Sequence, residues 1–229
     1  MMENNPLTIA GAVSLQEEKK QVNFAGRAYA FFFSYLFHPI FIPVYVVLFL
    51  VYVHPSAFAG FSDAQKKQTV LIVGLNLVFF PLISVLLLRA VGFIESIYLR
   101  TQKDRIIPYI ASGIFFFWAY TVFKQQTQYP LILTSFILGI FLASSVALIA
   151  NIYFKISMHA IGMGGWIGIF LLISNTQSML MTWPISVVLL LTGLVCSGRL
   201  LISSHKPADI YAGLFVGLIT QIAAAIFIL

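Results

Sequence analysis

The chain has 229 residues, of which 60% are hydrophobic and 9% are charged, and its mean hydropathy is +0.98. A soluble domain carries about 25% charged residues, so this composition excludes a water-soluble globule and a disordered chain. The single cysteine, Cys196, excludes an internal disulfide, and the net charge of +6 comes from basic residues scattered among apolar runs, unlike a nucleic-acid-binding patch. The sequence therefore predicts an all-α integral membrane protein.

The expected elements are a polar tail and seven apolar helices. Residues 1–27 form the tail, which lacks the apolar run of a signal peptide. The seven segments that follow are each near the ~20 residues with which a helix crosses a bilayer. They are 28–53, 69–92, 107–123, 129–153, 159–174, 179–198 and 208–229. Pro39 and Pro43 predict a kink or a re-entrant path in the first segment, so we expect one bundle of six to seven transmembrane helices over residues 28–229.

The segment 159–174 is short and rich in glycine. Glycines at a helix surface let two backbones approach closely inside a membrane. The glycines are Gly162, Gly164, Gly165 and Gly168. We therefore expect this helix to lie against a close neighbour.

Ionisable residues in the second half of the chain are concentrated in three short connections, at 100–108, 154–159 and 197–209. Two apolar segments separate each connection from the next. Because an even number of crossings returns the chain to the same side, all three connections are expected at one face of the membrane. Ionisable groups beside membrane spans are costly and mark functional sites.

The residue types in these connections suit phosphoryl transfer. Guanidinium groups bind phosphate oxygens in pairs, while His159 and His205 can divide the work of nucleophile and general acid. Asp209 lies four residues after His205 and can accept a hydrogen bond from its ring. No Cys/His/carboxylate set has the spacing of a zinc site, and no glycine-rich phosphate loop precedes a Lys-Ser or Lys-Thr pair. The available cations are Arg100, Lys103, Arg105 and Arg199.

These residues resemble the motifs of the type 2 phosphatidic acid phosphatase and vanadium haloperoxidase superfamily. Its third motif, S-R-x5-H-x3-D, is similar to Arg199, His205 and Asp209, which keep that spacing, with Gly198 where the motif has serine. The order of motifs and spans is also similar, and the resemblance covers about residues 95–217.

The other two motifs of the family are matched less closely. The second motif, P-S-G-H, is similar to Ser157 and His159, which keep the Ser-x-His spacing. The first motif, K-x6-R-P, finds its residue types at altered spacing, with Arg105 as the arginine and Lys103 or Arg100 as the other cation.

The resemblance implies a membrane phosphatase that needs no cofactor. His205 would attack phosphorus and become phosphohistidine, with Asp209 orienting it, and His159 would protonate the leaving alcohol oxygen and later activate water. The substrate would be a lipid phosphate or a polyprenyl diphosphate in the membrane, and no nucleic-acid partner is expected. The phosphoryl oxygens would be held by Arg199, Arg105, Lys103 and Ser157.

Several alternatives remain open at this point. The same chemistry serves a lipid phosphotransferase, and a non-catalytic membrane scaffold or a transporter would also place charges near spans. His38 and His54, each followed by proline, are expected to be structural, with His54 at the face opposite the site. We expect an integral protein of a bacterial cytoplasmic membrane, and the distribution of Lys and Arg leaves the side of the site open.

Overall fold

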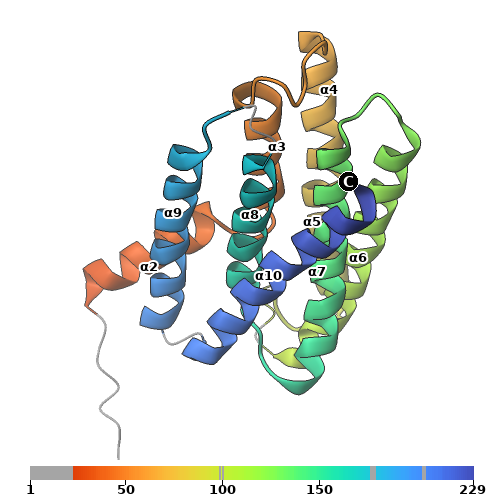
Figure 1. The fold of residues 1–229 in the computed structure, drawn as a ribbon. Helices are drawn as coiled ribbons and strands as arrows, with labels where there is room; N and C mark the ends of the chain where they lie inside the picture. Colours follow the sequence, from red (N-terminus) through yellow and green to blue (C-terminus); the bar gives the residue numbers. More distant parts are fainter. Residues whose placement is uncertain (1–22, 98, 100, 176–178, 203–204) are drawn as a thin grey trace, which may run out of the picture.

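The computed structural model describes residues 23–97, 99, 101–175, 179–202 and 205–229, and every regular element in these ranges is helical (Figure 1). The expected all-α fold is confirmed. Arg100 and most of the expected tail, residues 1–22, lie outside the described residues. In chain order the elements are α2 (Phe24–Leu36), α3 (Ile42–Leu48), the π-helical turn η1 (Phe49–Val53), α4 (Asp63–Gly74), the π-helical turn η2 (Leu75–Phe79), α5 (Phe80–Ala90), α6 (Gln102–Gln125), α7 (Leu131–Tyr153), α8 (Met158–Ser174), α9 (Thr182–Leu201) and α10 (Pro207–Ile228).

Among the described residues, five helical stretches are long and apolar enough to cross a membrane, so the chain is an integral membrane protein. They are Asp63–Ala90, Gln102–Gln125, Leu131–Tyr153, Thr182–Leu201 and Pro207–Ile228. The first of them runs without a break through α4, η2 and α5. Two further apolar helical stretches, Ile42–Val53 and Met158–Ser174, are shorter. They belong to the first and the fifth of the seven expected segments.

The expected segment 28–53 is not one continuous helix. A turn at residues 37–41 separates α2 from α3, and α3 begins with Pro43 in its first turn, where the missing N–H of proline costs no helical hydrogen bond. α2 lies across α9 (Figure 1), and the hydroxyl of Tyr29 donates to the carbonyl oxygen of Leu194 at 2.7 Å. The break that the prolines predicted is therefore present, and it directs α2 and α3 to different places.

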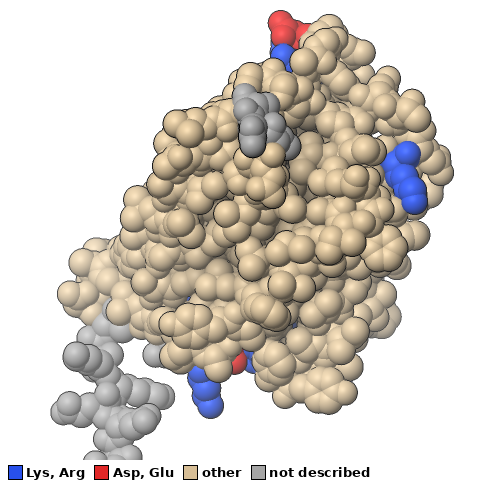
Figure 2. Space-filling model, viewed as in Figure 1, with Lys and Arg blue, Asp and Glu red and all other residues tan. Residues whose placement is uncertain are grey.

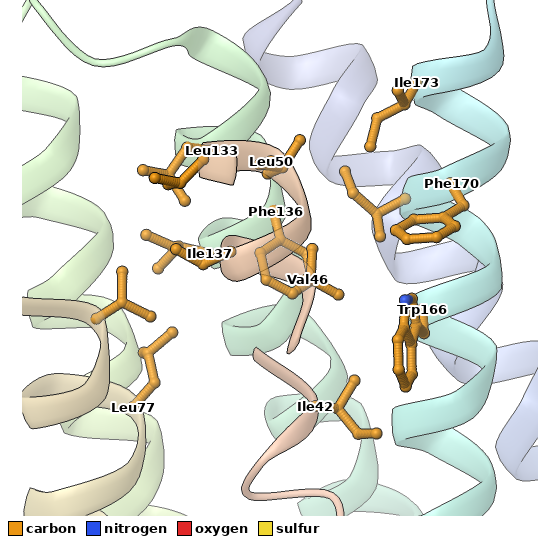
Figure 3. Packing of buried hydrophobic residues seen from close by; sticks show 14 of the residues in the cluster. Ile42, Val46, Leu50, Leu77, Leu133, Phe136, Ile137, Trp166, Phe170 and Ile173 are labelled. Atoms are coloured by element: carbon orange, nitrogen blue, oxygen red, sulfur yellow. The ribbon is translucent and has the colours of Figure 1, made fainter. Parts of the chain in front are cut away.

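α3 and η1 occupy the centre of the bundle (Figure 3). Ile42, Val46 and Leu50 are each at most 3% exposed, and they lie between α7 and α8, facing Phe136 and Trp166. Interiors are packed as densely as organic crystals, so these side chains contact protein instead of lipid. The second part of the expected segment 28–53 is thus part of the core.

α8 and α10 cross in close contact because glycines leave room where they meet. A Cβ atom on Gly217 would collide with the carbonyl oxygen of Ile161, and one on Gly213 would lie 2.8 Å from the carbonyl oxygen of Ser157. From the other side, a Cβ atom on Gly164 would collide with the backbone of α10. The close approach expected of the glycine-rich helix is confirmed, and its partner is α10.

The three polar connections lie at one end of the bundle, the lower end in Figure 1. Reciprocal hydrogen bonds of 2.8 Å join Gln102 and Asn151, each side-chain amide donating to the carbonyl oxygen of the other residue. The N–H of Ser157 donates to the carbonyl oxygen of Asp209 at 3.3 Å. Figure 2 shows charged side chains at the margins of the face in view and none across its broad middle. The expectation that the connections share one face is confirmed.

Candidate functional site

A cavity of about 2430 Å³ lies at the meeting point of the connections and extends into the bundle. This volume is larger than the roughly 300–1,000 Å³ of ordinary ligand pockets. Arg105, His159, Arg199 and His205 all line it, as the sequence predicted. Most of its remaining wall is apolar, with side chains from α2, α3, α5, α6, α7 and α8. The cavity therefore combines a cationic end with a long apolar wall.

His205 stands in the connection between α9 and α10, and its side chain is 3% exposed. Its Nδ1 atom lies 3.3 Å from the carbonyl oxygen of Lys155 and 3.5 Å from Oδ2 of Asp209. Both neighbours are hydrogen-bond acceptors, so Nδ1 carries the proton and the lone pair is on Nε2. This is the tautomer that a nucleophile needs.

The charge state of His205 follows from its surroundings. Burial lowers the pKa of this imidazole to about 4, and the charges of Arg199, Arg105 and Lys155 add to the effect, while Asp209 opposes it. The ring is therefore neutral at pH 7.

Asp209 is held in the first turn of α10. Its Oδ2 atom accepts a hydrogen bond from the backbone N–H of Lys206 at 3.0 Å, and Pro207 begins the helix. A carboxylate here is stabilised by the free N–H groups of the helix N-terminus. The side chain is thus fixed beside His205.

Three arginines, Arg27, Arg105 and Arg199, line the cavity, and none has a carboxylate partner among the described residues. The Nε atom of Arg199, in the last turn of α9, is buried and has no hydrogen-bond partner there. Arg105 donates from Nε to the carbonyl oxygen of Leu99 at 2.9 Å and from Nη1 to that of Ile156 at 3.4 Å. Leu99 has φ of 47°, a conformation that costs energy in a residue other than glycine. Burial, Arg105 and Arg199 also lower the pKa of Lys155, while Asp209 opposes them, so cations outnumber carboxylates at this end of the cavity.

His159 lies in the first turn of α8, and its ring contacts the last turn of α2 and the turn that follows it. Its Nε2 atom lies 3.0 Å from the carbonyl oxygen of Ser34 and therefore donates to it. The ring of His38 meets it edge-on, with centroids 5.3 Å apart and planes at 82°.

His38 also lines the cavity, although it belongs to none of the motifs found in the sequence. Its ionisable side chain within an apolar segment was the signal that could have identified it.

Several residues stand elsewhere than the resemblance implies. Ser157 is fully buried and caps α8, its hydroxyl accepting from the N–H of Ala160 at 3.4 Å. Lys103 is exposed in the first turn of α6, and neither residue lines the cavity. Gly198, which stands where the family has serine, admits α2, since a Cβ atom there would lie 3.2 Å from Cα of Ala30.

His54 follows η1, which ends at the opposite end of the bundle from the connection between α9 and α10 (Figure 1). Its Nδ1 atom accepts from the N–H of Ala57 at 3.1 Å, and the side chain is buried, which suits the structural role expected from the sequence.

Comparison of the chain with protein-family models, with curated proteins and with solved structures gives no match. The residues and the geometry of the cavity are therefore the basis on which a function is proposed.

Proposed function

We propose that the chain is a membrane phosphatase that hydrolyses a lipid phosphate or a polyprenyl diphosphate through a phosphohistidine on His205. The observation that carries the proposal is a neutral histidine in the same cavity as Arg105 and Arg199, which have no carboxylate partner among the described residues. A buried cation without a counter-charge is costly, and a bound phosphate would supply that charge. A transporter would more often place such groups in the middle of its spans.

Two histidines then carry the chemistry. In the first step Nε2 of His205 attacks phosphorus and the bond from phosphorus to the alcohol oxygen breaks. His159, which takes up a second proton on Nδ1 when the negatively charged phosphate binds, gives that proton to the alcohol oxygen. In the second step a water oxygen attacks phosphorus, His159 takes the proton of the water, and the bond from phosphorus to Nε2 breaks. Asp209 and the carbonyl oxygen of Lys155 keep the proton on Nδ1 of His205 throughout.

The arginines hold the transferred group. Charge develops on the phosphoryl oxygens during the reaction, and fixed donors at that point lower the barrier. We assign this role to Arg199 and Arg105. Ser157 is occupied as a helix cap and Lys103 is exposed, so we place them outside the first contacts of the phosphate.

The apolar wall of the cavity would take the tail of the substrate. Burying a hydrocarbon tail gives roughly 25 cal/mol per Å² of apolar surface, which would anchor the substrate with its phosphate at the arginines.

We propose that α8 is a sixth crossing and that α3 with η1 completes a seventh, in a bacterial cytoplasmic membrane.

Phosphate release tests this function. The purified protein in detergent should release inorganic phosphate from a panel of lipid phosphates and prenyl diphosphates without added metal, and vanadate should inhibit it because vanadate mimics the five-coordinate phosphoryl centre. The His205→Ala variant should lose all turnover, whereas His54→Ala, at the other end of the bundle, should keep it. Full activity in vanadate together with complete loss in a chelator would contradict the proposal. Labelled phosphate appearing only on an added lipid alcohol, and none in solution, would indicate a phosphotransferase instead.

A further inference from the structure

The last turn of α2 and the turn that joins it to α3 reach the site from outside the motif-bearing half of the chain. The carbonyl oxygen of Ser34 accepts from Nε2 of His159 at 3.0 Å, and the ring of His38 lies edge-on to the ring of His159. His38 and His159 line the same cavity as Arg199. The resemblance, which covers about residues 95–217, accounts for neither contact.

We propose that His38 is a positioning residue that fixes the plane of the His159 ring for proton transfer, an inference that rests on the proposed function. A hydrogen bond at Nε2 alone leaves the imidazole free to rotate about the line from Nε2 to the carbonyl oxygen. The edge-on contact with His38 removes that freedom, because aromatic rings prefer this arrangement at centroid separations of about 4.5–7 Å. Together the two contacts fix the direction in which Nδ1 of His159 points.

Hydrogen bonds within the turn that joins α2 to α3 hold His38 in place. Its Nδ1 atom accepts from the N–H of Ile40 at 3.4 Å, and its carbonyl oxygen accepts from the N–H of Phe41 at 2.8 Å. Pro39 restricts the backbone that follows, and Ile42 then enters the buried core as the first residue of α3. The orientation of the ring is therefore tied to the packing of the bundle.

A comparison of leaving groups tests this role. His159 donates a proton only to a leaving group that needs one, so a residue that acts through it should matter for an alkyl phosphate and not for p-nitrophenyl phosphate, whose phenolate leaves unprotonated. For His38→Ala we expect kcat/KM for a lipid alkyl phosphate to fall about 10- to 100-fold. This constant covers the steps up to formation of the phosphohistidine and excludes its hydrolysis, in which His159 activates water whichever substrate was used. The kcat/KM for p-nitrophenyl phosphate should change less than about twofold, and His38→Phe, which keeps a ring, should recover most of the loss on the alkyl phosphate.

Two further variants complete the test. His54→Ala removes the other histidine that precedes a proline. It should leave unchanged the ratio of kcat/KM for the alkyl phosphate to kcat/KM for p-nitrophenyl phosphate. In a His159→Ala background His38→Ala should cause no additional loss, because residues that act as a unit are not additive.

Three results would overturn the inference. An equal loss of kcat/KM on both substrates would show a structural role, and an unchanged kcat/KM on the alkyl phosphate would show no role, in both cases leaving the proposed function intact. A parent protein that is inactive on every substrate would overturn the proposed function and the role of His38 with it.

Discussion

At the scale of single residues, the surroundings of His205 decide whether it can act as a nucleophile. Lys155 offers a backbone acceptor and Asp209 a carboxylate acceptor to the same nitrogen, while Arg199 and Arg105 disfavour a second proton. The proton and the lone pair are thus assigned to opposite sides of one ring. Burial and the same arginines that would bind the phosphate keep the proposed nucleophile neutral.

The pH dependence of kcat/KM follows from these charges. A group that must be neutral loses activity as the pH falls through its pKa, so the acid limb of kcat/KM should lie near pH 4 and not near 6.5. Because Arg199 lowers the pKa of His205 and Asp209 raises it, Arg199→Gln should move the limb to higher pH and Asp209→Asn to lower pH. The ratio of each variant to the parent, measured from pH 4 to 8, cancels the ionisation of the substrate. Ratios independent of pH in both variants would show that His205 does not control the limb.

At the scale of elements, the crossing of α8 and α10 brings His159 and Asp209 to the same end of the bundle. α8 begins beside His159 and α10 begins beside Asp209, and a backbone hydrogen bond from Ser157 to Asp209 joins their starts. Closely packed glycines set the distance between the two helices over the following turns. The geometry of the site therefore depends on glycines, whose lack of a side chain lets the two helices approach closely.

A single methyl group should disturb this crossing. Gly217→Ala would force Cβ into the carbonyl oxygen of Ile161, and overpacking of this kind costs about 1–3 kcal/mol. We expect a lower unfolding temperature in detergent and a lower rate of phosphate release. Gly193→Ala in α9 is the matched control, since a Cβ atom there meets nothing within 4 Å and alanine favours a helix by about 0.5–1 kcal/mol. Equal unfolding temperatures for the two variants would contradict the account of the crossing.

At the scale of the whole molecule, the sequence predicted what depends on spacing and on the number of crossings. The fixed intervals between Arg199, His205 and Asp209 identified the cationic end of the cavity, and an even number of crossings placed His159 and Arg105 beside it. These inferences need only the lengths of apolar segments, which composition reveals.

Other features depend on which surface an apolar side chain meets, and the sequence does not encode that locally. Apolar residues such as Ile42 and Val46 suit a surface that faces lipid as well as one that faces the core, so the position of α3 could not be predicted from the sequence. The same holds for His38, because its partner His159 is far away in the chain and a His-Pro pair resembles an ordinary turn. Ser157 shows the converse, since a serine two residues before a histidine fits a motif and a helix cap equally well.

The most direct test of the account is a search for the covalent intermediate on His205. The His159→Ala variant should accumulate it, because the step that activates water is slowed while an activated substrate such as p-nitrophenyl phosphate needs no proton to react. After quenching at alkaline pH, where phosphohistidine survives, mass spectrometry of the peptide that contains His205 should show one added phosphoryl group on that residue. The corresponding peptide of a His159→Ala/His205→Ala double variant, treated in the same way, should carry no added phosphoryl group. Turnover of the substrate with no phosphoryl group on His205, or with the group on another residue, would contradict the central claim.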